Sequence, residues 1–197
     1  MSFINEKTKE IHCKIIYYGP PRCGKSTTLR CIFEEVRGSG KGELISLNHG
    51  DDRTLYFDFV PLNLGKARGY TIRLQLYTVP GEIGYQASRQ LTSKGLDGVV
   101  FIADSQLQKM EANILSLASL KEVVEKEGYK LETVPLVFQY NKRDLANAVP
   151  MSELSKILNQ RGASEFETVA TKGEGVFETL REIGTKVLMT LRNDTSA

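Results

Sequence analysis

Eight residues near the N-terminus constrain the fold of this chain more than any other stretch: Gly19-Pro20-Pro21-Arg22-Cys23-Gly24-Lys25-Ser26. Two glycines bracket four residues and are followed by Lys and Ser, which is the pattern of a phosphate-binding loop. The apolar, β-branched run from Ile11 to Tyr18 leads into the loop and predicts a buried strand. Apolar residues then recur at helical spacing, at Leu29, Ile32, Phe33 and Val36. The sequence therefore predicts a strand, a phosphate loop and a helix in succession.

The residue types in the loop predict a site for nucleotide phosphates and Mg²⁺. Gly24 allows the backbone to approach a phosphate closely, and the N-terminus of the helix directs positive charge at the anion. We expect Lys25 to reach the terminal phosphates and the Ser26 hydroxyl to coordinate Mg²⁺. The predicted nucleotide contacts extend to Thr27, and Lys25 is expected to face solvent in the empty loop. The alternative is a glycine turn with a surface lysine, which the flanking strand and helix disfavour.

Composition indicates the number of domains, the classes of partner and the redox state of the cysteines. The chain has 197 residues and 41% hydrophobic residues, which predicts one domain over 1–197. A net charge of +2 gives no reason to expect nucleic acid or a membrane surface as a partner. The cysteines, Cys13, Cys23 and Cys31, have no metal-ligand spacing. A disulfide at Cys23 would distort the phosphate loop, so reduced thiols and a cytoplasmic location are expected.

The ends of the chain carry no recognisable membrane signal. Met1–Asn5 has no apolar signal-peptide core, and Ser2 is not the glycine that myristoylation needs. No cysteine stands at the C-terminus for prenylation, and no apolar run is long enough to span a bilayer. We therefore expect no lipid anchor.

The rest of the chain predicts an α/β fold. Alternating residues from Leu55 to Phe59 and from Tyr70 to Leu76 flank a turn at Asn63–Lys66, which predicts an antiparallel hairpin. Strands and helices then alternate. The strands are expected at Gly98–Ala103, Pro135–Tyr140 and Phe166–Ala170. Apolar residues at helical spacing mark three helices. The first is marked by Met110, Ile114, Leu117, Leu120 and Val124, the second by Leu154, Ile157 and Leu158, and the third by Phe177, Leu180, Ile183, Val187, Leu188 and Leu191. This order predicts the three-layer fold of the P-loop NTPases: a mostly parallel sheet with one antiparallel hairpin and helices on both faces.

A second motif, Asn141-Lys142-Arg143-Asp144, follows the strand that ends at Tyr140. The Asp144 carboxylate can accept two hydrogen bonds from the ring N–H and the exocyclic amine of guanine, a donor pair that adenine lacks. Asn141 and the stem of Lys142 can hold the loop and cover the base. A solvated turn is the alternative, but a position downstream of a phosphate loop favours guanine recognition.

With both motifs in place, the chain resembles the small Ras-like GTPases. A closer resemblance, to the MglA subfamily of bacterial polarity GTPases, is carried by four segments: Asp52–Thr54, Leu76–Gly81, Gly98–Ser105 and Gln139–Leu145. The resemblance covers nearly the whole chain. It implies a GTP-dependent switch for cell polarity and motility, an MglB-like homodimeric activator, other polarity proteins as partners, and recruitment to a cell pole.

The resemblance also implies residue roles. The Gly81 N–H would contact the γ-phosphate, and the backbone N–H at Ala170 would contact the guanine carbonyl. Thr54 would bring its hydroxyl to Mg²⁺ when GTP is bound, unless it simply begins a strand. Arg53 would be an arginine finger supplied in cis, unless it forms a surface ion pair with Asp51 or Asp52.

Three residues depart from the usual pattern of small GTPases. Thr78 stands in place of an aspartate that organises Mg²⁺ water, Pro21 in place of a glycine, and Glu82 in place of the glutamine that orients the attacking water. Proline has no N–H to offer to phosphate, and a carboxylate brings negative charge towards it. These departures leave two functions open: a slow GTPase switch in which Arg53 and Glu82 are catalytic, and a binding module with impaired hydrolysis. A nucleotide kinase is disfavoured because no arginine-rich lid is recognisable.

Overall fold

The computed structural model describes residues 3–37, 45–48, 54–67, 69–81 and 86–194. Its strands are β1 (Phe3–Asn5), β2 (Glu10–Tyr18), β3 (Ile45–Asn48), β4 (Thr54–Ala67), β5 (Tyr70–Thr78), β6 (Gly98–Asp104), β7 (Leu136–Asn141) and β8 (Ser164–Thr168). Its helices are α1 (Lys25–Arg37), α2 (Gln86–Ser93), α3 (Met110–Lys126), α4 (Met151–Leu158) and α5 (Val176–Asp194).

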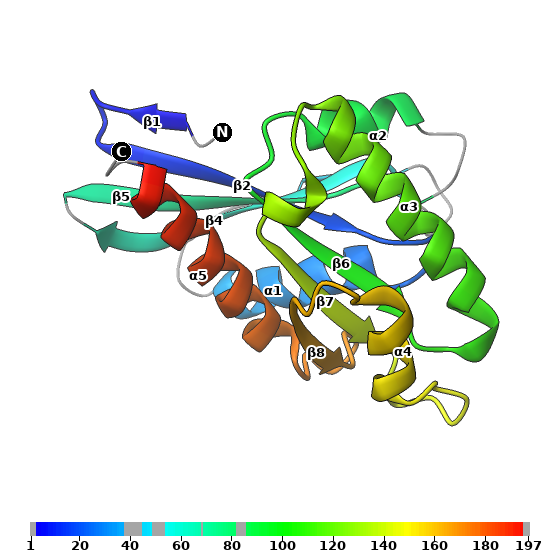
Figure 1. Ribbon diagram of the computed structural model, residues 1–197. Helices are drawn as coiled ribbons and strands as arrows, with labels where there is room; N and C mark the ends of the chain where they lie inside the picture. Colours follow the sequence, from blue (N-terminus) through cyan, green and yellow to red (C-terminus); the bar gives the residue numbers. More distant parts are fainter. Residues whose placement is uncertain (1–2, 38–44, 49–53, 68, 82–85, 195–197) are drawn as a thin grey trace.

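All the strands belong to one sheet, with the order β3-β4-β5-β2-β6-β7-β8 and with β1 paired to β2 (Figure 1). The strands from β5 through β2, β6 and β7 to β8 run parallel. The β4–β5 pair is the predicted antiparallel hairpin. The turn predicted at Asn63–Lys66 is wrong, because β4 continues to Ala67, which pairs with Tyr70. Two further antiparallel pairs, β3 with β4 and β1 with β2, extend the sheet and were not predicted. The predicted fold class is confirmed.

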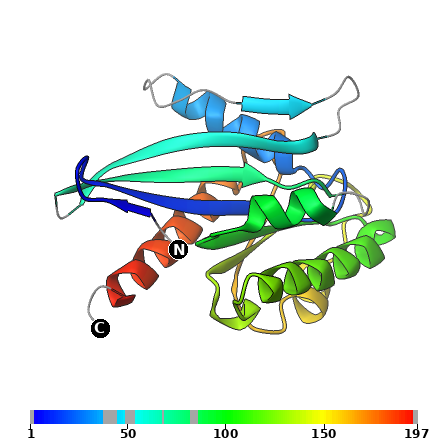
Figure 2. The same ribbon diagram turned by 90° about the horizontal axis from the view of Figure 1, so that it is seen from above.

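Helices cover both faces of the sheet (Figure 2). On one face, Leu29 and Ile32 of α1 and Ile183 of α5 pack against Ile15 and Tyr17 of β2. This packing confirms the apolar faces predicted for the first and last helices. Each fully buried side chain of this size contributes about 1.5–3 kcal/mol to folding.

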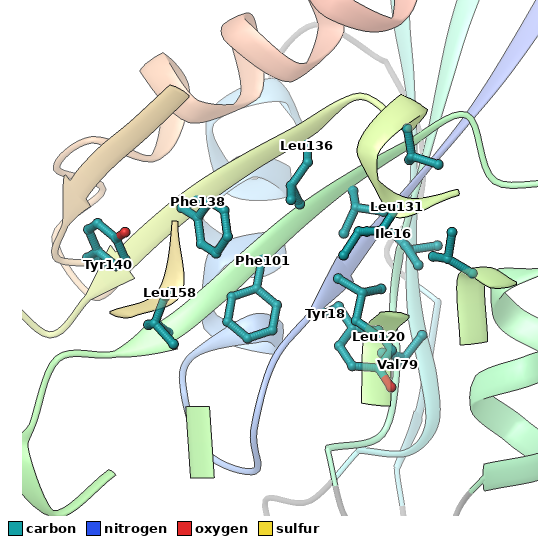
Figure 3. Packing of buried hydrophobic residues seen from close by; sticks show 14 of the residues in the cluster. Ile16, Tyr18, Val79, Phe101, Leu120, Leu131, Leu136, Phe138, Tyr140 and Leu158 are labelled. Carbon is teal, nitrogen blue, oxygen red and sulfur yellow. The ribbon is translucent and has the colours of Figure 1, made fainter. Parts of the chain in front are cut away.

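The opposite face is covered by α3 and α4, with α2 beside α3. Figure 3 shows this packing: Phe101 of β6 and Phe138 of β7 belong to one apolar cluster with Leu120 of α3 and Leu158 of α4. The rings of Phe101 and Phe138 lie edge to face with centroids 5.6 Å apart. Every residue of β6 and β7 is buried. Residues Gly98–Ala103 of β6 accordingly form a continuous apolar run, whereas β7 also buries the polar side chains of Gln139 and Asn141.

Several predicted details were wrong. Ile114 was assigned to the buried face of α3 but is 45% exposed, and Asn113 occupies the buried position instead. The final strand ends at Thr168, two residues before the predicted end, because Val169 and Ala170 belong to the loop that follows. Helix α2 was not predicted. The predicted loop at 38–42 lies outside the described residues, as does most of the loop at 48–54.

No helix within the described part of the chain is long and apolar enough to cross a membrane.

Candidate nucleotide-binding site

The carboxyl ends of the parallel strands meet at one edge of the sheet, where ligands bind in folds of this kind. The phosphate loop follows β2, the second motif begins at the end of β7, and the loop after β8 lies next to both. These segments enclose a cavity of about 230 Å³. The residues lining it are Arg22, Gly24, Thr27, Asn141, Lys142, Asp144, Leu145, Val169, Ala170 and Thr171. The fold thus brings the two predicted motifs, far apart in sequence, to one cavity.

Asn141 joins the three segments. It is 3% exposed, and its Nδ2 donates to the Cys23 carbonyl at 2.7 Å. Its Oδ1 accepts from the Ala170 N–H at 3.0 Å and from the Thr168 hydroxyl at 3.1 Å. Gly24, at φ 109°, is required beneath this side chain, since a Cβ there would lie 2.1 Å from Asn141 Nδ2. Asn141 is therefore a brace between loops. The Ala170 N–H already donates to Asn141 Oδ1. If it also contacts the guanine carbonyl, the two acceptors must share this one N–H.

Lys25 does not face solvent, so that expectation was wrong. It is 6% exposed, and its Nζ donates to the carbonyls of Gly19 at 2.9 Å and Pro20 at 2.7 Å. Carbonyl groups buried in a tight loop need donors, and the ammonium group meets that need from within the loop. To bind a phosphate, Lys25 must exchange these carbonyls for phosphate oxygens.

Gly81 packs directly on the phosphate loop. A Cβ at this position would lie 2.5 Å from the Pro21 nitrogen and 2.8 Å from Lys25 Nζ. Glycine is therefore needed here for close approach of the two segments. This arrangement brings the residue predicted to sense the γ-phosphate next to the lysine predicted to bind it.

The surroundings of the loop favour an anion. The positive end of α1 and Lys25 lie together at the end of the loop, and Arg22 has a left-handed backbone, with φ 60°. Burial raises the pKa of the Cys23 thiol, and the nearby Lys25 charge opposes that shift only partly. Cys23 therefore stays neutral and adds no negative charge next to a phosphate.

The residues proposed to hold Mg²⁺ are only partly described. Ser26 is the second residue of α1, and Thr54 is the first residue of β4. The hydroxyl oxygen of Ser26 suits the oxygen preference of Mg²⁺. Thr78, at the end of β5, is fully buried. Arg53 and Glu82 lie outside the described residues.

With this geometry in view, comparison with known proteins decides the family. The ADP-ribosylation factor family matches residues 1–187. The chain belongs to this family. Like other members of the ADP-ribosylation factor family it is a Ras-like GTPase domain, and it is a GTP-dependent switch resembling MglA.

Two relatives show how close the similarity is. The mutual gliding-motility protein MglA of Myxococcus xanthus (strain DK1622) is 53% identical over 192 residues, which cover 98% of each chain. The human ADP-ribosylation factor-like protein 4A is 25% identical over 177 residues, which cover 86% of this chain and 80% of the human protein. The predicted resemblance to Ras-like GTPases and to MglA is confirmed.

Several residues that shape this site were not predicted from the sequence. Leu145, Val169 and Thr171 line the cavity next to predicted contacts, and their place beside the motifs was the available signal. Arg143 does not line the cavity. It donates to the Val149 carbonyl and forms an ion pair with Glu167 at 2.9 Å, which fixes the base-binding loop from behind.

Asp144→Asn is expected to weaken GTP binding by about 10–100-fold, because it removes a charge-assisted hydrogen bond to guanine worth roughly 1.5–3 kcal/mol. The side chain is exposed and lines the cavity, so the substitution should leave the fold intact. Fluorescence titration with labelled GTP and ATP analogues measures the effect. Equal affinity of the wild type for the two nucleotides would refute the assignment.

Proposed function

We propose that residues 1–197 form a single small-GTPase domain that binds guanine nucleotide with Mg²⁺ and hydrolyses GTP slowly when unaided. The observation that carries this proposal is the shared cavity at the carboxyl edge of the sheet. Gly24 of the phosphate loop, Thr27 of α1, and Lys142 and Asp144 of the second motif line it. The cavity thus joins a phosphate-binding segment to a base-binding segment. A nucleotide has two matching parts, an anionic phosphate chain and a planar base.

The base end of the cavity suits guanine. Asp144 lines the cavity, and no described residue hydrogen-bonds to its carboxylate in the structure. Two acceptor oxygens are thus available for the two N–H donors on the guanine edge. Leu145 and the stem of Lys142 supply apolar surface for the faces of the base.

The phosphate end suits a triphosphate with Mg²⁺. Lys25 would leave the Gly19 and Pro20 carbonyls for the β- and γ-phosphates, and the Gly81 N–H would meet the γ-phosphate. Ser26 and Thr54 would hold Mg²⁺, which when bound neutralises charge on the phosphates. Gly19, Pro20, Pro21, Arg22, Cys23, Gly24, Lys25, Ser26 and Thr27 together form the phosphate contact.

Hydrolysis is assigned to Arg53 and Glu82. Arg53 would neutralise charge on the transferred phosphoryl group, and Glu82 would lie near the attacking water. A partner that positions Arg53 would stimulate the reaction. By similarity to MglA, this partner is an MglB-like homodimer, and other polarity proteins recruit the chain to a cell pole.

A binding module without useful hydrolysis was the competing function, suggested by Pro21, Thr78 and Glu82. Membership of the GTPase family does not favour it. Phosphate release from GTP in excess over enzyme separates the two functions. We expect several turnovers per molecule in the presence of the activating partner, whereas release that stops at or below one phosphate per molecule would support the binding module.

Glu82→Gln is expected to raise partner-stimulated turnover, because the substitution removes a negative charge from the vicinity of the γ-phosphate. Even in bulk water, one unit charge removed from a distance of about 4 Å is worth about 1 kcal/mol, or roughly fivefold in rate. Single-turnover phosphate release measures it. A large loss of rate would instead show that the carboxylate acts as a base.

The hairpin Leu55–Leu76 and the segment Asn48–Thr54 are expected to change backbone protection between nucleotide states. The hairpin begins at Thr54, and its second strand leads to Gly81. A movement of either of these predicted phosphate-sensing residues would therefore displace one end of the hairpin. A γ-phosphate would enter where Gly81 packs on Pro21. Hydrogen exchange with GDP and with a non-hydrolysable GTP analogue measures the difference. Identical protection in the two states would contradict the prediction.

A further inference from the structure

A fully buried carboxylate lies behind the base end of the cavity. Asp104 ends β6 and is 0% exposed, yet it does not line the cavity. Its Oδ2 accepts from Lys142 Nζ at 2.7 Å, and its Oδ1 accepts from the Gln106 N–H at 3.1 Å. The Gln106 side chain donates to both oxygens, at 3.1 and 3.3 Å. A buried charge with this many donors is held in one orientation.

Asn113 of helix α3 hydrogen-bonds to the backbone of Asp104. Asn113 is fully buried, whereas its neighbour Ile114, which was predicted for the apolar face, is 45% exposed. Its Oδ1 accepts from the Asp104 N–H at 3.0 Å, and its Nδ2 donates to the Asp104 carbonyl at 2.9 Å. Because one amide satisfies both backbone groups, Asp104 is fixed relative to α3 as well as to β6.

Lys142 is the residue that Asp104 holds. It has φ 67°, an uncommon backbone conformation for a residue with a side chain, and it lines the cavity. Its ammonium group points back to Asp104, so the apolar stem must run along the cavity wall. A side chain with four rotatable bonds would otherwise sample many orientations, at a cost in entropy on binding.

The loop that carries Asp144 lies on the segment after Asp104. The Ser105 N–H donates to the Asn141 carbonyl at 2.9 Å, and the Val149 N–H donates to the Ser105 carbonyl at 2.8 Å. Both ends of the base-binding loop are thus attached to the backbone next to Asp104.

We propose that Asp104, fixed by Asn113, is a positioning residue that holds the stem of Lys142 in place over the base and thereby slows release of guanine nucleotide. The inference rests on the proposed nucleotide function and adds a residue to which no role has been assigned. Asp104 does not line the cavity and is not expected to touch a nucleotide atom. It acts through Lys142, while Asp144 alone reads the edge of guanine.

Asp104→Asn is expected to accelerate release of a fluorescent GDP analogue about tenfold, because a neutral amide replaces the charged acceptor of Lys142 Nζ. The ratio of GDP affinity to inosine diphosphate affinity should stay the same, because inosine lacks only the exocyclic amine that faces Asp144. In a Lys142→Met background, Asp104→Asn should accelerate release no further. Glu125→Gln makes the same change of charge on the exposed side of α3 and should leave the rate unchanged.

Three results would overturn the inference. They are an unchanged release rate in Asp104→Asn, an equal acceleration in the Lys142→Met background, and a fall in the GDP-to-inosine-diphosphate ratio, which would indicate general distortion of the pocket. Thermal unfolding of the nucleotide-free variants identifies such distortion independently. Failure of the wild type itself to bind GDP would overturn the proposed function together with this inference, whereas tight binding by the wild type with no effect of Asp104→Asn would overturn the inference alone.

Discussion

Lys25→Ala is expected to abolish high-affinity binding of GTP and GDP, raising Kd by about 100-fold or more. Two charge-assisted hydrogen bonds to phosphate are worth roughly 1.5–3 kcal/mol each, and the binding free energy loses both. The structure adds a second effect. Lys25 Nζ is bonded to the Gly19 and Pro20 carbonyls, so its removal leaves two loop acceptors without that donor. We therefore expect the nucleotide-free protein to lose about 1–2 kcal/mol of stability while remaining folded.

Isothermal titration with GDP and thermal unfolding without nucleotide measure these two effects separately. Lys156→Ala is a matched control, because it removes an exposed lysine from α4, far from the phosphate loop in sequence. The control should bind GDP as the wild type does. Normal GDP binding by Lys25→Ala would show that the loop is not a phosphate site.

Arg53→Ala is expected to remove most of the stimulation of GTP hydrolysis by an activating partner, without changing GTP affinity. An arginine finger is worth roughly 10³–10⁵ in rate, because it neutralises charge that develops only in the transition state. The loss should therefore be seen in single-turnover rate with partner present, and much less in the unaided rate. Arg181→Ala, which removes an exposed arginine from α5, is the control. Full stimulation of the Arg53 variant would place the catalytic arginine elsewhere, for example on the partner.

The parts of the fold that were predicted correctly depend on local patterns. The phosphate loop has fixed spacing, β4 and β5 alternate, and α1 and α5 have apolar faces with a period near that of a helix. Each signal lies within a window of about 10–20 residues and needs no knowledge of distant contacts. The two motifs then required only the rule that carboxyl ends of parallel strands share one edge.

The elements that were missed depend on distant contacts. Strand β1 has three residues, Phe3–Asn5, which is too short for a periodic pattern, and it forms by pairing with β2. Helix α2 has no apolar face to recognise. Its Leu91 is 73% exposed, whereas Arg89 is 6% exposed and donates to Ser119 of α3. A reversal of burial of this kind cannot be read from hydrophobic periodicity.

The errors within the site have the same origin. Lys25 was expected in solvent because its own sequence neighbourhood shows no partner, but the carbonyls that it binds are produced by the tight turn of the loop. Asn113 was overlooked because apolar neighbours suggested that Ile114 faces the core. Its burial is explained only by two hydrogen bonds to the backbone of Asp104, nine residues earlier in the chain.

The nucleotide that copurifies with the protein reports directly on whether the chain binds guanine nucleotide. The protein is purified with Mg²⁺, denatured, and the released small molecules are separated and identified by chromatography and mass spectrometry. We expect GDP or GTP, close to one per chain, and no guanine nucleotide from the Lys25→Ala variant prepared in the same way. Release of an adenine nucleotide, or of no nucleotide from a protein that then fails to bind added GTP, would contradict this expectation.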